Sequence, residues 1–275
     1  MSQIGLRTGF KATKGNHSFV TSDVVDSGLS NTAQQLVEFP TPHFPRDQKK
    51  QIPCCVSCAI VAAMEALDGL MGGAAKLSPM FHYFFARPAQ AGMPWLTFEQ
   101  GLAAAVQHGV CREELFPSTF ESEQLNVQPP DDAIEDGLRH CAQLLDPATL
   151  EHGFWELTSS RRLEEWKRTL SARIPILMGF HAVSRYLQLD HADGISGDVL
   201  PTEGETTSDV RHAAAVLGFR QQIPNDPDGA FWVVDSRGPT FGTGGGWWLP
   251  FALVETELVI EAWALRLITY GLDGI

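Results

Sequence analysis

The sequence predicts an α+β protein in which a helical first half is followed by a second half of short β-strands. Between about residues 57 and 108, three stretches carry helical composition and helix-end signals. Beyond about residue 174, short apolar runs alternate with Gly, Pro and Asp turns, which is typical of antiparallel strands. The polar, Pro-containing segment 120–135 separates these regions and predicts a boundary between two lobes.

The first 45 residues are expected to form an arm laid over the surface. They are mixed polar with scattered Gly and Thr, and Pro40, Pro42 and Pro45 prevent a helix near their end. A short strand is expected at 34–39. The predicted organisation is therefore an arm at 1–45, a helical lobe at 46–130 and a β-rich lobe at 131–275, together forming one domain.

Three helices are predicted in the helical lobe. The segment 57–70 is rich in Ala, Leu and Met and is apolar nearly all round, which indicates a buried helix. A second helix begins after Leu77, with Ser78 as its N-cap and Pro79 in its first turn. A third runs over 97–108, with a threonine cap at its start and a glycine after its end.

The β-rich lobe is predicted to contain one helix and four strands. A helix at 161–171 leads into a strand at 174–180, and a Gly, Asp and Thr-rich loop follows at 186–208. The remaining strands are expected at the following ranges: 213–219, 230–235 and 247–250.

Composition and charge exclude several classes of protein. The chain has 275 residues, of which 44% are hydrophobic and 19% charged, so a sizeable core is expected. The net charge of −13 repels phosphate backbones and argues against nucleic acid as a partner. The start of the sequence lacks the apolar core of a signal peptide, and no stretch reaches the ~18 apolar residues of a membrane span. We therefore expect a cytoplasmic protein without a membrane partner.

The five cysteines are expected to be reduced, because their number is odd and no signal peptide is present: Cys54, Cys55, Cys58, Cys111 and Cys141. The pair Cys55-x-x-Cys58 also matches a redox motif or half of a zinc site. Zinc requires a second ligand pair, which the sequence lacks, and a redox pair of the thioredoxin type follows a strand rather than a Lys-rich coil. We therefore expect no metal and no cofactor.

Cys58 is the candidate nucleophile because it stands near the predicted start of the helix at 57–70. A helix N-terminus carries partial positive charge and free N–H groups, which favour the reactive thiolate. The same N–H groups can stabilise an oxyanion. The competing interpretation is a buried apolar cysteine, since free Cys is among the most buried residue types.

The segment 46–65 resembles the papain family, in which a Gln precedes Cys-Gly-Ser-Cys-Trp and an Ala-rich helix. In this comparison Cys58 falls on the family's nucleophile and Cys55 on its upstream cysteine. Further segments that are similar to family motifs follow in the family's order: 77–81, 92–95, 108–117, 211–219, 231–238 and 242–250. The resemblance covers about 35–260 and implies a papain-like two-lobe fold. Such a fold has a helical N-terminal lobe, an antiparallel sheet or barrel in the C-terminal lobe, and the active site in the cleft.

The resemblance also implies a role for each candidate catalytic residue. His212 opens the strand at 213–219, as the family's catalytic histidine does, and is expected to be the base. Asp235 takes the place of the family's Asn and is expected to orient the imidazole. The family's oxyanion donor is a Gln six residues before the nucleophile, where Ile52 stands here. Gln51 is the favoured donor and Gln48 the second choice.

Four residues are expected to bind substrate because they match the family's pocket: Gly92, Met93, Pro94 and Ala213. They predict an apolar pocket beside the nucleophile. A glycine in this set leaves room for a substrate backbone to pair in extended form. The resemblance therefore implies a peptide or protein substrate.

The implied function is a cysteine peptidase that acts through a thioester on Cys58. The same thioester could instead pass its acyl group to an amine, in a transpeptidase, an amidase or another peptide-modifying enzyme. Four departures favour a third interpretation as a peptide-binding module on a decayed fold: Val56, Ala59 and Arg237 in place of Gly, Trp and Trp, and the shifted position of the Gln. No inhibitory prosegment of the usual length precedes the helix. We therefore expect either that the activity is harmless in its compartment or that it is restrained by a regulatory partner, by the loop at 186–208 or by narrow specificity.

Overall fold

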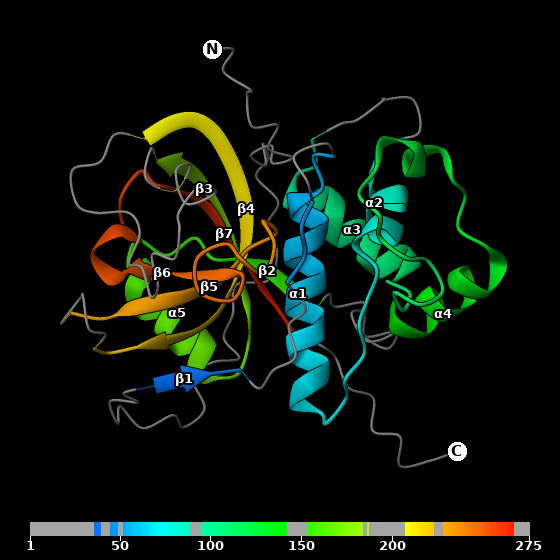
Figure 1. Ribbon diagram of the computed structural model, residues 1–275. Helices are drawn as coiled ribbons and strands as arrows, with labels where there is room; N and C mark the ends of the chain where they lie inside the picture. The colour runs from blue at the N-terminus through cyan, green and yellow to red at the C-terminus, as the bar shows by residue number, and fades with distance from the viewer. Residues whose placement is uncertain are drawn as a thin grey trace, which may run out of the picture.

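The computed structural model describes residues 36–39, 45–48, 52–88, 95–141, 153–183, 186, 207–222 and 228–266. Within these ranges the fold is α+β, as the sequence predicts, with the helices preceding most of the sheet (Figure 1). Four predicted site residues, Gln51, Gly92, Met93 and Pro94, lie outside the described residues.

The described part of the chain contains five α-helices and seven strands. The helices are α1 (Cys55–Leu70), α2 (Pro79–Ala86), α3 (Phe98–His108), α4 (Asp131–Cys141) and α5 (Arg162–Ser171). The strands are β1 (Leu36–Glu38), β2 (Phe154–Glu156), β3 (Ile176–Val183), β4 (Thr207–Arg220), β5 (Ala230–Val234), β6 (Gly246–Pro250) and β7 (Val259–Leu265).

The strands form one antiparallel sheet in the order β2-β7-β3-β4-β5-β6, with β1 added to β4. Within the described residues no pairing joins β2 to β6, so the sheet is open and is not a closed barrel. The long strand β4 occupies its middle, where Phe180 of β3 lies opposite His212. This register places the predicted base in the interior of the sheet rather than at its edge.

The predicted helix ends are confirmed for α2 and α3. Ser78 caps α2 by accepting a hydrogen bond from the N–H of Phe81 over 3.1 Å. Thr97 and Gln100 form a reciprocal capping box at the start of α3. Gly109 follows α3 with a φ of 65°, a left-handed conformation that glycine adopts without strain.

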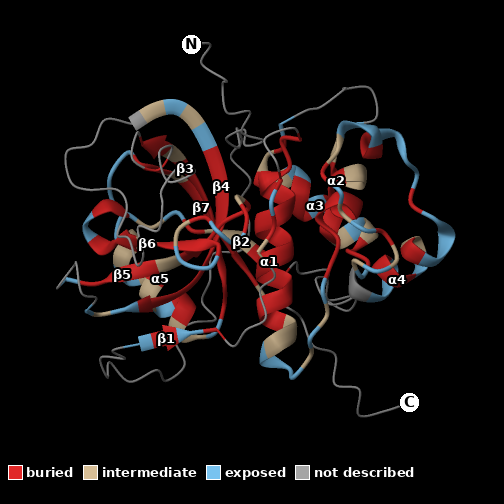
Figure 2. Cartoon of the chain, in the orientation of Figure 1, coloured by how far each residue is buried: buried red, intermediate tan, exposed pale blue. Residues whose placement is uncertain are grey.

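Helix α1 lies between the sheet and the other helices of the first lobe (Figure 1). Every residue from Cys55 to Leu67 is buried, which explains why the sequence is apolar on all sides (Figure 2). One face packs among buried side chains of α2 and α3, such as Phe81 and Leu102. Ala62 and Ala66 pack instead into the core of the sheet. Helix α1 is thus shared by both lobes.

Helix α4 lies with the helical lobe, although the sequence-based boundary at 130 assigns it to the β-rich lobe. A Cβ added to Gly137 of α4 would lie 2.8 Å from the ring of Phe81, so the two helices pack closely. Asp136 also pairs with Arg112 over 3.1 Å. The polar segment before α4 is therefore a surface connection within the helical lobe, and the next strand of the sheet after it is β2.

Candidate active site

The first turn of α1 places Cys55, rather than Cys58, at the helix start. The helix begins at Cys55, with Cys54 as its N-cap. The N–H of Cys58 already donates to the carbonyl of Cys54 over 3.0 Å, so it belongs to the helical ladder. The N–H groups left without a partner in the ladder are those of the first three helical residues. The helix-start position that the sequence assigns to Cys58 thus belongs to Cys55.

Cys58 lies one turn further into α1. It is 4% exposed, and its Sγ is 3.9 Å from the Sγ of Cys54. Together with Ala213 and Asp235 it lines a small cavity between the helix and the sheet. Burial, followed by the influence of Cys58 and Cys55, holds the pKa of the Cys54 thiol well above its usual range. Cys54 is therefore a neutral thiol packed behind the helix start.

His212 is held by Asp235 and influenced by Cys55. The Nε2 atom of His212 lies 2.8 Å from Oδ1 of Asp235, and the ring is almost fully buried. Burial is the largest influence and lowers the pKa of His212. The negative charge of Asp235 and its hydrogen bond, together with the influence of the Cys55 thiol, outweigh it and raise the pKa to about 10. The thiol that acts on this imidazole is thus that of Cys55.

The second ring nitrogen of His212 is the one available to the thiol. Nδ1 is buried and has no hydrogen bond of ordinary geometry among the described residues. Because Nε2 is engaged by Asp235, Nδ1 is the ring nitrogen that is left for a second partner. Both Asp235 and Cys55 raise the pKa of this imidazole.

Asp235 directly follows β5 and is surrounded by donors. Oδ1 accepts hydrogen bonds from Nε2 of His212 and from the N–H of Ser236, each over 2.8 Å. Oδ2 accepts from the hydroxyl of Tyr186 and from Nε1 of Trp247, each over 3.0 Å. Burial raises the pKa of Asp235, but the charge and hydrogen bond of His212, the nearby Arg237 guanidinium and Trp247 bring it below its usual value. The carboxylate is therefore ionised near neutral pH.

Arg237 occupies the position at which the papain family has a tryptophan. Its guanidinium carbon lies 4.8 Å from the ring centroid of Tyr186 and 4.8 Å from that of Phe241. Its Nη1 donates to the carbonyl of Tyr186 over 3.3 Å. Stacking of a guanidinium on aromatic rings is favourable. Arg237 thus fixes the residue whose hydroxyl contacts Asp235.

The short segment 45–48 contacts both the turn after β5 and helix α1. The N–H of Gln48 donates to the carbonyl of Ser236 over 3.0 Å, and the Ser236 hydroxyl donates to Oε1 of Gln48 over 3.0 Å. The N–H of Gly238 donates to the carbonyl of Arg46 over 2.7 Å. Gln48 is 4% exposed. Its amide oxygen is engaged by Ser236, so its orientation is fixed and its NH₂ group is directed away from that hydroxyl.

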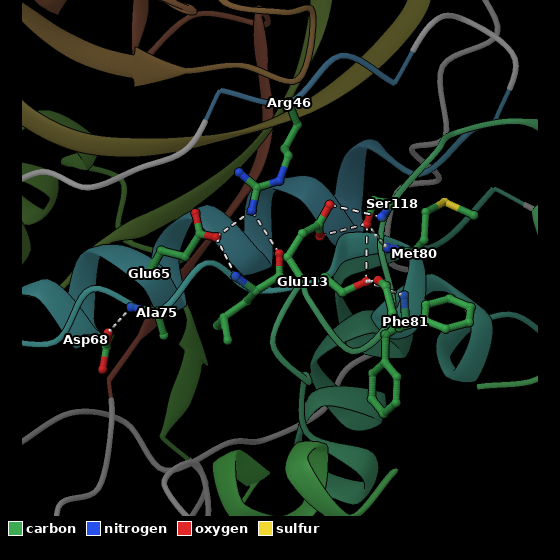
Figure 3. Close-up of polar contacts among 11 residues, drawn as sticks. Arg46, Glu65, Asp68, Ala75, Met80, Phe81, Glu113 and Ser118 are labelled. Carbon is green, nitrogen blue, oxygen red and sulfur yellow. Dashed lines mark hydrogen bonds and ion pairs between the residues drawn. The ribbon is translucent and has the colours of Figure 1, made fainter. Parts of the chain in front are cut away.

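The same segment is anchored on α1 by a buried ion pair. Nη2 of Arg46 lies 2.5 Å from Oε1 of Glu65 and donates to the carbonyl of Leu77 over 2.8 Å (Figure 3). The Glu65 carboxylate also accepts the N–H of Leu77 over 2.8 Å. These contacts tie the segment that carries Gln48 to the helix that carries Cys55.

His82 has a structural role in the helical lobe. Its Nδ1 lies 2.8 Å from the Ser57 hydroxyl and its Nε2 lies 2.8 Å from the carbonyl of Gly101. Burial lowers the pKa of His82 to about 4, so the ring is neutral. Both ring nitrogens are engaged, so His82 links α2 to Ser57 of α1 and to Gly101 of α3.

The described part of the chain contains no group of three or more His, Cys, Asp or Glu side chains that could hold a metal ion. Four cysteines in it are free and buried: Cys54, Cys55, Cys58 and Cys111. None of its helices is long and apolar enough to cross a membrane.

The structure brings His212 and Asp235 together and sets them beside the start of α1. Ala213, predicted to bind substrate, is buried next to His212 in β4. Sequence reasoning did not find Cys55, Tyr186 or Trp247 as parts of this arrangement. For Cys55 a signal exists, since Pro53 limits how early a helix begins and leaves residues 55–57 as its first turn.

The described helices and sheet form a papain-like fold. A similar solved structure is xylellain, a cysteine protease from Xylella fastidiosa, with a TM-score of 0.73 and 17% identity over 96% of this chain and 97% of that one. Digestive procathepsin L 3 of Tenebrio molitor larval midgut has a TM-score of 0.63 and 14% identity, covering 84% and 69%. The proform of the ragweed pollen allergen Amb a 11, a cysteine protease, has a TM-score of 0.67 and 17% identity, covering 91% and 71%.

A scan against protein-family models and a search of curated proteins found no match. The likeness to the solved structures therefore establishes the papain-like fold.

Proposed function

We propose that this protein is a cysteine peptidase whose nucleophile is Cys55, with His212 as the acid and base and Asp235 as the orienting residue. The observation that carries the proposal is that Asp235 holds His212 at 2.8 Å while the Cys55 thiol, at the first residue of α1, raises the pKa of the same imidazole. This assignment replaces Cys58, which the sequence favoured, by the cysteine three residues earlier. The similarity of the fold to solved structures of cysteine proteases supports the proposed peptidase activity.

The proposed reaction follows from the charges in the site. The raised pKa of His212 favours a proton on the imidazole, which leaves the Cys55 thiolate as its partner. The thiolate attacks the peptide carbonyl, and a C–S bond forms as the carbonyl electrons move to oxygen. The imidazolium protonates the amine, which leaves as the C–N bond breaks. His212 then takes a proton from water, which attacks the thioester and releases the acid and the thiolate.

The oxyanion is proposed to be bound by the N–H of Cys55 and the amide NH₂ of Gln48. The N–H at the first position of a helix has no partner within the helix. Gln48 is buried, and two hydrogen bonds to Ser236 fix its position next to the Asp235 turn. Donors fixed before the reaction are the most effective in stabilising charge that develops in the transition state. These observations favour Gln48 over Gln51.

The acceptor of the acyl group distinguishes the proposed peptidase from a transpeptidase or amidase. Both kinds of enzyme use the same thioester, and the mass of the product tells them apart because hydrolysis adds one water. A peptide-binding module without catalysis is the third possibility, and absence of any turnover would favour it.

The test uses two matched cysteine variants of the full-length chain on a mixed peptide library analysed by mass spectrometry. Cys55→Ala is expected to abolish turnover and Cys58→Ala to retain it, because each removes one buried sulfur from the same helix turn while only Cys55 faces His212. Loss of turnover in Cys58→Ala together with retention in Cys55→Ala would overturn the assignment. Circular dichroism of both variants checks that the fold is kept.

A further inference from the structure

Oδ2 of Asp235 is the carboxylate oxygen that does not contact His212. It accepts hydrogen bonds from two side chains outside the proposed triad. Tyr186 donates its hydroxyl to Oδ2 over 3.0 Å, and Trp247 donates its indole N–H to the same atom over 3.0 Å. Tyr186 is 2% exposed and Trp247 is 1% exposed. Water is therefore excluded from Oδ2, and its negative charge is compensated by fixed donors.

The aromatic environment holds Tyr186 in this place. Its ring lies 5.4 Å from that of Phe241, 5.3 Å from that of Phe180 and 5.8 Å from that of Trp247, measured between centroids. The Arg237 guanidinium covers the ring at 4.8 Å and donates to the backbone carbonyl of Tyr186. The Tyr186 hydroxyl is thus held against Asp235 because the ring that carries it is packed among other aromatic side chains.

A carboxylate creates a problem at this position that an amide does not. A carboxylate whose charge is not offset by other hydrogen bonds strongly stabilises the protonated imidazole beside it. The imidazolium is then a weaker acid and protonates the leaving group more slowly. Each hydrogen bond to the far oxygen draws charge away from the oxygen that faces the imidazole. The donors on Oδ2 therefore set how strongly Asp235 holds the proton on His212.

We infer that Tyr186 is a positioning residue which, with Trp247, holds the Asp235 carboxylate and moderates its charge toward His212. The inference rests on the proposed triad and deepens it, because it explains how an aspartate serves where the papain family has an asparagine. Tyr186 acts through Asp235 and is not assigned any contact with substrate.

The charged and titratable groups around this pair come from several elements. Cys55 faces His212 from α1, while Asp235 and Arg237 follow β5. Tyr186 lies between β3 and β4 in the sequence, and burial together with Asp235 holds its pKa well above its usual range. The Tyr186 hydroxyl therefore stays protonated, and donates, throughout the pH range of the test.

The test is a double-mutant cycle of Tyr186→Phe and Asp235→Asn in the full-length protein. The readout is the titration of the His212 imidazole, followed by NMR of ring-labelled histidine and assigned with His212→Gln. Tyr186→Phe keeps the ring and removes only the hydroxyl. We expect it to raise the pKa of His212 by about half a unit, a factor of about three in proton affinity. In the Asp235→Asn background, where the charge is absent, we expect the same change to have no such effect.

Activity provides the second readout. Tyr186→Phe is expected to lower kcat by about threefold to tenfold with little change in KM, because proton transfer to the leaving group is slowed. Thr169→Val is the control, since it removes another buried hydroxyl, one that donates to the carbonyl of Glu165 within α5. It should leave the titration and kcat unchanged.

Two results would overturn the inference. One is an equal shift of the His212 titration with and without the Asp235→Asn substitution, and the other is no shift in folded Tyr186→Phe. The NMR readout does not require turnover. A protein with no peptidase activity but with the expected titration cycle would therefore refute the proposed function and leave the role of Tyr186 intact. A protein with peptidase activity in which Tyr186→Phe leaves the titration of His212 unchanged would refute only the role of Tyr186.

Discussion

Gln48 and Ser236 hold each other through two hydrogen bonds, although 188 residues separate them in the sequence. This contact fixes the amide of Gln48 next to the turn that carries Asp235. If its NH₂ group binds the oxyanion, Gln48→Ala should lower kcat by about 10²–10³ with a smaller change in KM. Steady-state kinetics on a peptide substrate measure the effect.

Gln51→Ala is the matched control for that prediction, because both glutamines lie shortly before α1 in the sequence. We expect Gln51→Ala to keep kcat within about threefold of the unmodified protein. The reverse pattern, with the large loss at Gln51, would restore the donor that the sequence favoured.

Asp235 is expected to tolerate an amide better than a methyl group. In Asp235→Asn the side-chain oxygen can still accept the N–H of His212, whereas Asp235→Ala leaves the ring without an orienting partner. We expect kcat to fall by about tenfold in the first variant and by at least another tenfold in the second. A larger loss in Asp235→Asn than in Asp235→Ala would show that the charge itself is required.

The raised pKa of His212 predicts a pH dependence of stability. Unfolded histidine titrates near ~6.5, and the folded value is about 10. The folded state binds the proton more tightly, so this contribution is fully present below pH ~6.5 and is lost as pH rises toward 10. In a Cys55→Ala background, where no thiol exchanges a proton with the imidazole and Asp235 still raises the pKa of His212, the free energy of unfolding should fall between about pH 6.5 and 8 by up to ~1.4 kcal/mol per pH unit from this group.

Urea unfolding of Cys55→Ala and of the double variant Cys55→Ala/His212→Gln, at about pH 6.5, 7.2 and 8, measures this slope. The double variant should lose most of it while keeping the remaining pH dependence. Identical slopes in the two proteins would mean that His212 is not held in its protonated form by the folded structure.

The ion pair between Arg46 and Glu65 is expected to be important for folding, since both side chains are buried. Removing one partner leaves a buried charge, so Glu65→Gln or Arg46→Met should each destabilise the protein by about 3–5 kcal/mol. The double variant should be less destabilised than the sum of the two, because no unpaired charge remains. Additive losses by chemical denaturation would contradict a direct interaction.

The α+β fold can be predicted from the sequence because its signals are local. Caps such as Ser78 and Thr97, and the apolar stretch of α1, act within a few residues of the elements they define. The pairing of strands is not local, and neither is the position of α4, which depends on the packing of Gly137 against Phe81. Such contacts leave no periodic pattern in the sequence.

The site residues divide in the same way: some follow from signals in the sequence, and others depend on contacts that form only in the folded chain. Asp235 follows from a strand-end pattern and from the resemblance to a family. His212 follows from the resemblance alone, because it lies within β4 and does not open a strand as the sequence predicts.

The register of the cysteines does not follow from the sequence, because three of them fall within five residues and both Cys55 and Cys58 fit part of a motif. The physical start of α1 separates them, and that depends on where Pro53 and Cys54 end the preceding segment. Tyr186 could not be predicted, since only the folded chain brings it to Asp235.

The most direct test of the proposed nucleophile is to identify the cysteine that reacts with a thiol-directed peptidyl epoxide near neutral pH. The folded full-length protein is labelled, digested and mapped by fragmentation mass spectrometry, with His212→Gln as a control for activation. We predict modification of Cys55 that depends on His212. Modification of Cys58 instead, or equal labelling of Cys55 with and without His212, would contradict the assignment.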